Sequence, residues 1–198
     1  YLLHEIKGHQ FRVGAQSFFQ GNHEQAGAAV DVIRQWVTDD GERPGGLLGD
    51  LYCGVGLFSL TLADLFDQVV AIDSDPGGCR DARTNVQHDA EARGKVKVHV
   101  GRMSDLLGKP ELAPASFWRS GMCVIDPPRA GLGKEAVQAL LKAAPRRLIY
   151  MSCDPATLAR DAAALVAGGF EVKKLKVLDM FPQTAHIESL LLLDRKDP

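Results

Sequence analysis

The stretch LLGDLYCGVGLFSLTLADLFDQVVAID, residues 47–73, decides the fold of this chain. Its two apolar runs, 47–53 and 69–73, flank a turn with glycines at 54 and 56 and a segment that reads as a helix. A strand, a tight turn, a helix and a second strand are the repeating unit of parallel sheets. The stretch therefore predicts the first half of an α/β domain.

The same alternation continues toward the C-terminus. Apolar runs at 96–100, 122–126 and 147–153 alternate with longer amphipathic segments. Two more strand-like stretches, 170–181 and 186–193, follow a helical segment at 156–167 with no helix between them. We predict an α/β fold with a doubly wound, mostly parallel seven-stranded sheet of Rossmann-like type, closed by an antiparallel pair.

The N-terminal part has a different pattern. LLHEIKGHQFRV, residues 2–13, alternates partially around Lys7-Gly8 and predicts a β-hairpin. Asn22 and Gln25 resemble a capping box, which predicts a helix that runs to the Gly/Pro-rich loop 39–46. The chain starts at Tyr1 in what reads as a strand pair, so we expect a preceding N-terminal portion.

The composition narrows the functional classes. The chain has 198 residues, 45% of them hydrophobic, and a net charge of −2, which is not the basic character of a protein that binds nucleic acid without regard to sequence. Any RNA contact must come from a local patch. The cysteines at 53, 79, 123 and 153 match no zinc or iron–sulfur spacing, and no apolar run approaches a membrane span. We expect a cytoplasmic chain with no metal.

Two carboxylates at strand ends suggest a cofactor site. In open α/β sheets, ligands bind outside the carboxyl ends of the strands, where Asp50 and Asp73 lie. Gly54 and Gly56 allow the backbone to approach a ligand, while Ser59 in the third glycine position argues against a dinucleotide. Asp73 can accept both hydroxyls of a ribose, which favours a nucleoside-type cofactor. The alternative is that these residues only cap strands and form a tight turn.

Further along the chain, Asp105 follows the third strand and either accepts from an adenine amino group or caps the next turn. Asp126 ends the fourth strand, and the two prolines after it stiffen the loop that carries Arg129, a residue suited to carboxylate or phosphate. An arginine in place of an aromatic residue after the prolines argues against methylation of a base amino group.

Cys153 ends the fifth strand, immediately before a helix that starts near Pro155. The positive end of a helix lowers the pKa of a thiol, so the sequence allows a reactive thiolate here. It equally allows a buried packing residue, which is what we expect of Cys53, Cys79 and Cys123. The chain has no nucleophile elbow of a hydrolase.

His186 and Glu188 stand two residues apart, and would share one face of a strand. A glutamate that leads into an apolar strand can have a raised pKa and act as a base. Taken alone, Glu188 is more simply a solvated strand end.

Five motifs in order give a resemblance that covers nearly the whole chain: SFFQGN (17–22), DLYCGVG (50–56), DPPRAGLG (126–133), SCDPATLARD (152–161) and DMFPQTAHIES (179–189). Together they resemble the catalytic domain of the S-adenosylmethionine-dependent RNA uracil-5 methyltransferases, which have a class I methyltransferase fold. The resemblance implies that residues 16–198 form the catalytic domain and that 1–15 is the remnant hairpin of a preceding central domain.

The resemblance also assigns roles. It implies that Cys153 attacks carbon 6 of uracil and that Glu188 removes the proton from carbon 5. It implies that one group of residues binds S-adenosyl-L-methionine and that three others contact the substrate: Phe18, Arg129 and His186. The cofactor set comprises Gln20, Asp50, Tyr52, Gly54, Gly56, Asp73, Asp105 and Asp126. Asp154 stands where many members have asparagine, and we expect this extra carboxylate to raise the pKa of Cys153.

The substrate implied by the resemblance is a uridine in RNA, and we favour 23S ribosomal RNA over tRNA. The RNA-binding domains of the family are missing from this sequence, so we expect weak RNA binding. The alternatives are an RNA cytosine-5 methyltransferase, which also uses cysteine addition at carbon 6, and a non-catalytic, truncated domain that binds cofactor or serves as an RNA scaffold.

Overall fold

The computed structural model describes residues 1–38, 41, 43–180, 183–184 and 187–196. The strands are β1 (Leu2–Ile6), β2 (His9–Val13), β3 (Leu47–Leu51), β4 (Gln68–Asp73), β5 (Val96–Val100), β6 (Met122–Ile125), β7 (Arg147–Ser152), β8 (Phe170–Leu178) and β9 (Glu188–Arg195). The α-helices are α1 (His23–Val37), α2 (Leu57–Thr61), α3 (Pro76–His88), α4 (Met103–Leu106), α5 (Ala115–Ser120), α6 (Gly133–Ala143) and α7 (Pro155–Ala167), and Ala63–Leu65 is a 3₁₀ turn. No helix among these residues is long and apolar enough to cross a membrane.

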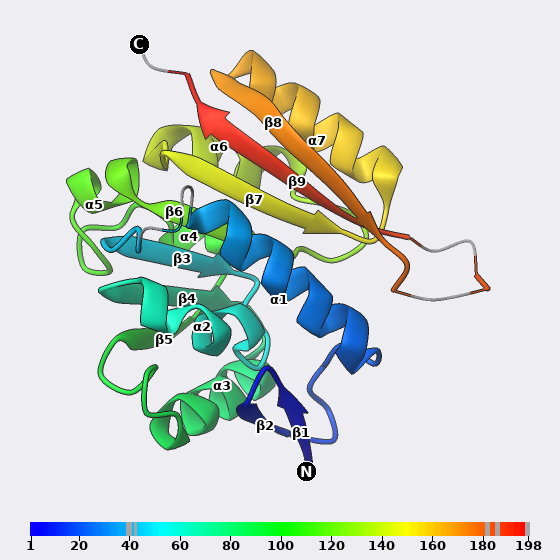
Figure 1. Cartoon of the computed structure of the whole chain (residues 1–198). Coiled ribbons are helices and arrows are strands. Elements are labelled where there is room, and N and C mark those ends of the chain that lie inside the picture. Colours follow the sequence, from blue (N-terminus) through cyan, green and yellow to red (C-terminus); the bar gives the residue numbers. More distant parts are fainter. Residues whose placement is uncertain (39–40, 42, 181–182, 185–186, 197–198) are drawn as a thin grey trace.

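The main sheet has seven strands in the order β5-β4-β3-β6-β7-β9-β8 (Figure 1). Neighbouring strands from β5 to β7 are parallel, and β9 runs antiparallel to both β7 and β8. The predicted seven-stranded, doubly wound sheet with an antiparallel pair is confirmed. The last strand begins at Glu188, two residues later than the sequence pattern suggested, and His186 lies outside the described residues.

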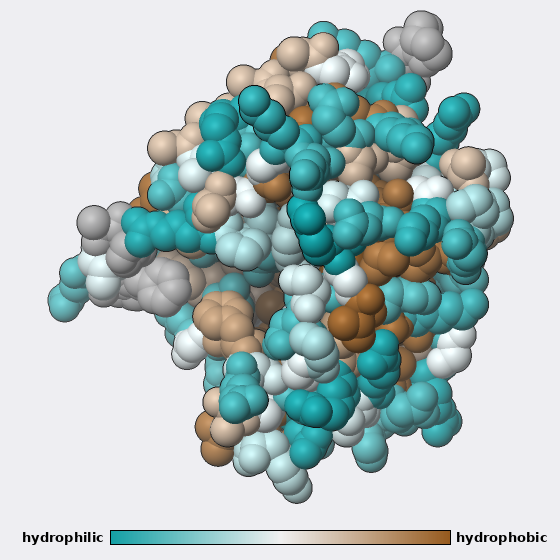
Figure 2. Space-filling view, turned by 180° about the vertical axis from the view of Figure 1, so that it is seen from behind, coloured by the Kyte–Doolittle hydropathy of each residue, from teal (hydrophilic) through white to brown (hydrophobic). Residues whose placement is uncertain are grey.

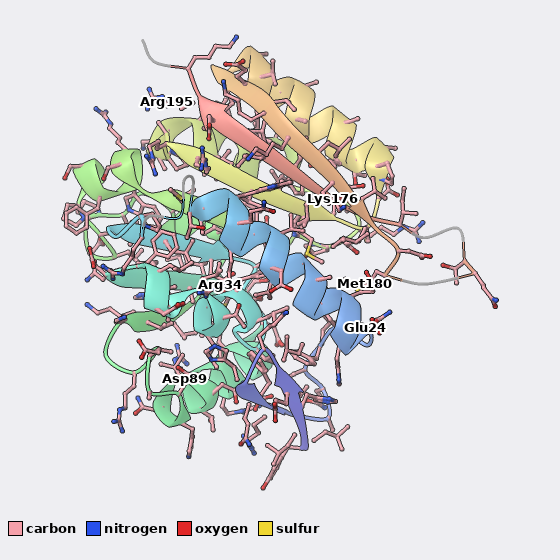
Figure 3. All side chains as sticks on the ribbon, viewed as in Figure 1. Glu24, Arg34, Asp89, Lys176, Met180 and Arg195 are labelled. Atoms are coloured by element: carbon pink, nitrogen blue, oxygen red, sulfur yellow. The ribbon has the colours of Figure 1, made fainter. Side chains whose placement is uncertain are left out.

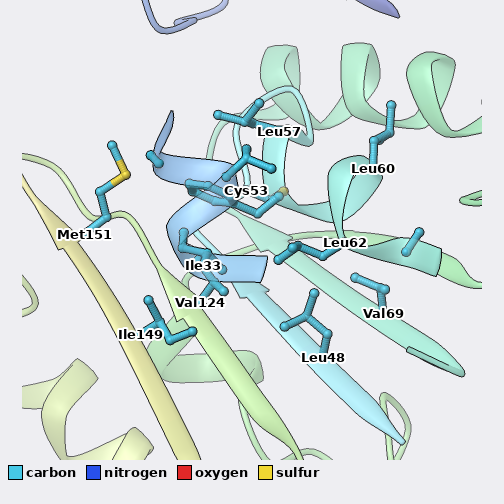
Figure 4. Close-up of a cluster of buried hydrophobic side chains, with 14 of the residues drawn as sticks. Ile33, Leu48, Cys53, Leu57, Leu60, Leu62, Val69, Val124, Ile149 and Met151 are labelled. Atoms are coloured by element: carbon cyan, nitrogen blue, oxygen red, sulfur yellow. The ribbon is translucent and has the colours of Figure 1, made fainter. Parts of the chain in front are cut away.

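The central strands β3, β4, β6 and β7 are buried on both faces, as parallel strands between two helical layers must be. One face packs against α1 and α2, in a cluster that includes Ile33, Leu48 and Ile149 (Figure 4). The other packs against α6 and α7, around Trp118, Leu140 and Leu165. Two separate cores therefore hold the sheet rigid between them, and the loops at its carboxyl edge are anchored on both sides.

Helix α1 begins where the sequence predicted. The side chain of Asn22 accepts a hydrogen bond from Gln25 N at 3.1 Å, which satisfies one of the free N–H groups of the first turn. Its amide also donates to the carbonyl oxygen of Met180 at 3.1 Å. The same asparagine therefore caps the helix and ties it to the segment that follows β8, and Figure 3 shows Met180 near the start of α1.

The N-terminal hairpin is confirmed, with Lys7 (φ 54°) and Gly8 (φ 80°) in the left-handed conformation of a tight two-residue turn. Phe11 is fully buried in the same core as Ile33 and Leu48. Asn85 of α3 accepts from Arg12 N at 2.8 Å and donates to Arg12 O at 3.1 Å. The hairpin thus shares the core of the main domain, and its origin in a separate central domain stays a prediction.

Strand β9 is held between β7 and β8 in one alignment. Ser189 lies opposite Ser152, and at the other end of the pair Asp194 lies opposite Arg147. The Arg147 guanidinium donates to both carboxylate oxygens of Asp194, from Nε at 2.6 Å and from Nη2 at 2.9 Å. Between these ends, β9 is a run of four buried leucines, Leu190 to Leu193.

Candidate active site

A cavity of about 620 Å³, called the main cavity below, opens at the carboxyl edge of the sheet. Figure 2 shows the molecule from behind, where hydrophobic groups emerge in patches between hydrophilic ones. The lining includes nine residues predicted from the sequence: Phe18, Gln20, Tyr52, Gly54, Asp73, Asp126, Arg129, Cys153 and Glu188. Asp50, Gly56 and Asp105 are absent from the lining, and His186 lies outside the described residues.

The turn after β3 has an unusual backbone. Tyr52 (φ 67°), Gly54 (φ 51°) and Gly56 (φ 94°) all adopt positive φ, which is costly for a side chain as large as that of tyrosine. Gly54 N donates to Asp73 Oδ2 at 2.8 Å, and Asp75 N donates to Asp73 Oδ1 at 2.8 Å. Each oxygen of Asp73 keeps a further lone pair for a ligand. The carboxylate is therefore fixed in place at the wall of the cavity.

Asp50 supports this turn from below. Its side chain is buried, Oδ2 accepts a hydrogen bond from Ser59 Oγ at 2.5 Å, and Oδ1 has no partner among the described residues. Burial raises the pKa of Asp50 to about 7. Ser59 thus has a function that the sequence did not reveal, because it binds the aspartate that precedes the glycine turn.

Cys153 follows β7 and is half-buried in the main cavity. Burial raises the pKa of its thiol, and the negative charges of Glu188 and Asp126 raise it further, while Arg129 opposes them. The expectation of a pKa lowered by the helix start is therefore wrong for this structure. Nearby carboxylates and desolvation outweigh the partial positive charge of the α7 N-terminus.

Asp154 also behaves differently from the prediction. Its Oδ1 accepts from Ala156 N and Thr157 N, both at 3.0 Å, so it is the N-cap of α7. Its Oδ2 lies 3.5 Å from Arg129 Nε, and these interactions lower the pKa of Asp154. The groups that raise the pKa of Cys153 are Glu188 and Asp126 rather than this neighbour in sequence.

Glu188 and Asp126 are two carboxyls held in a poorly solvated place. Glu188, the first residue of β9, is 3% exposed, and burial raises its pKa to about 7, so the simpler interpretation of a solvated strand end is wrong and the alternative of a raised pKa holds. Burial, with the charges of Glu188 and Asp50, raises the pKa of Asp126 to about 8. Gln20 Nε2 approaches Asp126 Oδ2 at 3.5 Å. The cavity thus holds a thiol with a raised pKa and two carboxyls whose pKa values are raised to about 7 and about 8.

A second cavity of about 450 Å³ adjoins the main one and shares Tyr52, Asp73 and Ser74 with it. Its other walls are Arg102 to Ser104, directly after β5, and the segment from Leu132 to Ala136. Asp105 is exposed, accepts from Ser104 Oγ at 3.1 Å, and lines neither cavity. The rule that ligands bind at the carboxyl ends of strands correctly pointed to the loop after β5, but it did not identify Arg102, Met103 and Ser104 as the lining residues.

The other three cysteines are buried, as expected of packing residues, although Cys53 also touches the main cavity. Among the described residues, no three His, Cys, Asp or Glu side chains are grouped as a metal site would require.

A family model described as tRNA (uracil-5-)-methyltransferase matches residues 4–107 and 111–196. The chain belongs to this family. Its relatives include uncharacterized RNA methyltransferases of Thermosynechococcus vestitus, 37% identical over 98% of this chain, and of Aquifex aeolicus, 34% identical over 100% of this chain. The chain spans 41% and 44% of the length of these two relatives, respectively.

One solved structure agrees with this family assignment, and another shares the fold. The tRNA (uracil-54, C5)-methyltransferase of Pyrococcus abyssi, solved in complex with S-adenosyl-L-homocysteine, is 28% identical and superposes with a TM-score of 0.79 over 97% of this chain and 44% of its own. The magnesium protoporphyrin IX methyltransferase of Synechocystis covers 92% of this chain and 87% of its own at a TM-score of 0.64. At 19% identity, the latter likeness concerns the fold alone.

Proposed function

We propose that this chain is the catalytic part of an RNA methyltransferase that transfers a methyl group from S-adenosyl-L-methionine to carbon 5 of a uridine in RNA. One observation carries the proposal: a half-buried thiol and a buried carboxyl with a pKa of about 7 share one cavity, and the charge of the carboxyl raises the pKa of the thiol. If Cys153 were only a packing residue and Glu188 only a solvated strand end, we would not expect both to line the same cavity.

The residues present fit the proposed methyl donor. Asp73 offers free lone pairs at the wall shared by both cavities, which suits the hydroxyls of a ribose. A Cβ atom at Gly54 would meet nothing within 4 Å, so the backbone of the turn is open to a ligand. The adjoining cavity, with Met103 and Arg102, can take a flat adenine ring. When bound, S-adenosylmethionine supplies the methyl group that carbon 5 takes up.

Cys153 and Glu188 have separate tasks in this reaction. Carbon 5 of uracil is a poor nucleophile, so the Cys153 thiolate first bonds to carbon 6 and the ring becomes an enolate that is reactive at carbon 5. After methylation, Glu188 takes the proton from carbon 5. The electron pair of that C–H bond restores the double bond between carbons 5 and 6 and expels the thiolate. Without the base, the enzyme would remain attached to its product.

The other lining residues suit the pyrimidine and the RNA strand. Asp126, with its pKa of about 8, is protonated at neutral pH and can donate a hydrogen bond to a ring oxygen, next to Gln20. Phe18 is 75% exposed, so its ring is available to stack on a base at the cavity mouth. Arg129 suits a backbone phosphate. The role of His186 at the substrate stays a prediction.

For the RNA itself, we keep 23S ribosomal RNA as the first candidate. The second candidate is tRNA, because the family model and the Pyrococcus abyssi enzyme are both named for tRNA. A target uridine must leave its stack to reach a cavity of this kind, which favours loops over duplex. We expect RNA to bind weakly to these 198 residues by themselves.

The test is intact-protein mass spectrometry after incubation with S-adenosylmethionine and RNA that contains 5-fluorouridine, whose fluorine Glu188 cannot remove. We expect a methylated adduct that maps to Cys153, with the Cys153→Ser variant as the matched control. No adduct in a sample that binds S-adenosylhomocysteine with full stoichiometry would contradict catalysis by this chain alone.

Two alternatives have their own discriminators. An RNA cytosine-5 methyltransferase would form the same thiol adduct, and parallel assays with 5-fluorocytidine and 5-fluorouridine RNA separate the two bases. A non-catalytic domain that binds cofactor or RNA would show cofactor binding by calorimetry with no turnover on ribosomal RNA or tRNA. The pairing of Cys153 with Glu188 favours the uracil enzyme, because a scaffold needs neither residue.

A further inference from the structure

The loop after β6 carries Asp126 and Arg129 into the main cavity, and a buried carboxylate on another element holds that loop. Asp161 of α7 is 3% exposed. Its Oδ2 accepts from Leu132 N at 2.7 Å and from the hydroxyl of Tyr150 at 2.9 Å. Its Oδ1 accepts from Arg160 Nε at 3.0 Å and Nη2 at 2.9 Å. Both oxygens are thus engaged away from the cavity.

Two more side chains of α7 hold the same loop. Thr157 Oγ1 donates to the carbonyl oxygen of Arg129 at 3.2 Å, and Arg160 Nη2 donates to that of Ala130 at 2.9 Å. With Asp161 on Leu132 N, helix α7 therefore binds the loop through three of its backbone groups. These bonds fix the loop along most of its length rather than at one point.

The fit between the loop and α7 is close. Gly131 has φ 78°, and a Cβ atom there would collide with Asp161 Oδ2 and lie 2.7 Å from Arg160 Nη2. Only glycine allows the loop to approach the helix in this way. The contact is therefore specific to these residues.

The significance of this contact lies in where α7 begins. Helix α7 starts at Pro155, directly after Cys153 and its capping neighbour Asp154. The helix that follows the thiol therefore also holds the loop that brings Arg129 and the two prolines to the cavity, while Asp126 at the start of that loop donates its N–H to Leu51 O of β3 at 3.2 Å. Asp126 is near enough to Cys153 to raise the pKa of the thiol.

We propose that Asp161 is a positioning residue that fixes the loop bearing Asp126 and Arg129 relative to Cys153. The proposal rests on the function proposed above, because a fixed distance matters only if the thiol and the loop act on one substrate. Groups that react together must be held by partners whose own positions are fixed. Asp161 is the last residue of the SCDPATLARD motif, to which the sequence analysis assigned no task at this position.

The main experiment compares Asp161→Ala, Asp161→Asn and Tyr150→Phe with the unchanged protein. Tyr150→Phe is the matched control, because it removes one bond to Asp161, in the same buried place, without touching the loop. Each variant is first titrated with S-adenosylhomocysteine, so that all rates are given per folded, cofactor-binding molecule.

The first readout is the rate of adduct formation with 5-fluorouridine RNA. We expect Asp161→Ala to slow it about tenfold or more, the usual range for a misplaced reacting group. Asp161→Asn keeps an oxygen that can accept from Leu132 N and loses the ion pair with Arg160, so it should restore part of the rate. Tyr150→Phe should react at the unchanged rate while unfolding at a lower urea concentration.

The second readout needs no RNA. Iodoacetamide labelling of Cys153, mapped by peptide mass spectrometry from pH 6 to pH 10, reports the ionisation of the thiol. A displaced loop hydrates the thiol and weakens the effect of Asp126, and both changes lower the pKa of the thiol. Loss of the nearby Arg129 charge acts in the opposite direction but is the smallest of the causes, so the midpoint in Asp161→Ala should fall by about half a pH unit or more. This readout stays decisive even if the unchanged protein forms no RNA adduct, which would refute the proposed function instead.

The proposal is overturned if Asp161→Ala shows an unchanged labelling midpoint, or if Tyr150→Phe shows the same defects as Asp161→Ala. Should Asp161→Ala fail to fold, Arg160→Met replaces it, since the Arg160 side chain is 55% exposed and binds the loop at Ala130. A smaller shift in the same direction supports the proposal, and an unchanged midpoint refutes it.

Discussion

In the proposed reaction, the pH dependence of the last chemical step follows from the burial of Glu188. Burial raises the pKa of this carboxyl from its usual 4.5 to about 7. Only the carboxylate form accepts a proton, and about 90% of Glu188 is ionised at pH 8 but about 10% at pH 6. Removal of the carbon-5 proton should therefore slow about ninefold between pH 8 and pH 6. A glutamate with an ordinary pKa would be almost fully ionised at both values.

A pH-jump experiment isolates this step from the ionisation of Cys153. The methylated adduct is allowed to accumulate at pH 6 on RNA with tritium at carbon 5, and samples are then shifted to final values between pH 6 and pH 8. Tritium release and loss of the covalent protein–RNA complex are followed together. In Glu188→Gln the adduct should persist at every pH. Release rates that agree within about twofold across this range would refute the assignment of Glu188 as the base with a raised pKa.

Three other outcomes are expected. The raised pKa means that Glu188 gives up its proton less readily in the folded state than in the unfolded state, so the protein loses stability as the pH rises from about 4.5 through 7. In urea unfolding, the stability of Glu188→Gln relative to the unchanged protein should therefore increase by about 2–3 kcal/mol between pH 5 and pH 8. A relative stability that is equal at both pH values would contradict this. Asp73→Ala should weaken binding of S-adenosylhomocysteine about 10- to 100-fold in calorimetry, whereas the exposed Asp105→Ala control should leave it unchanged. Phe11→Ala should destabilise the fold by about 3–5 kcal/mol in urea, since the ring is fully buried; a loss below about 1 kcal/mol would mean that the hairpin is not part of the cooperative core.

The centre of the sheet was predictable because β3, β4, β6 and β7 are buried on both faces and so appear as short apolar runs. Asp73 and Asp126 were placed at the correct edge for the same reason, since the carboxyl ends of parallel strands meet there. These are local signals that need no knowledge of the final packing.

The ionisation of Cys153 could not be predicted from local signals. The sequence shows the helix that follows the cysteine, and this suggested a lowered pKa. Glu188 and Asp126 come from other strands, and only the folded sheet brings them next to the thiol and raises its pKa. The contact of Asp161 with Leu132 was hidden for the same reason, because the two residues lie on different elements.

The ion pair between Arg147 and Asp194 at the far end of β7 and β9 has a consequence for the opposite end of these strands. Leu190 and Leu192 pack into one core and Leu191 and Leu193 into the other, so a slip of β9 by one residue would still place leucine at three of these four buried positions, with Ser189 or Asp194 at the fourth. Apolar burial by the leucines therefore distinguishes only weakly between alignments that place different residues beside Cys153. The Arg147–Asp194 pair forms only in the observed alignment, so in the proposed enzyme two residues far from the cavity help to place Glu188 beside Cys153.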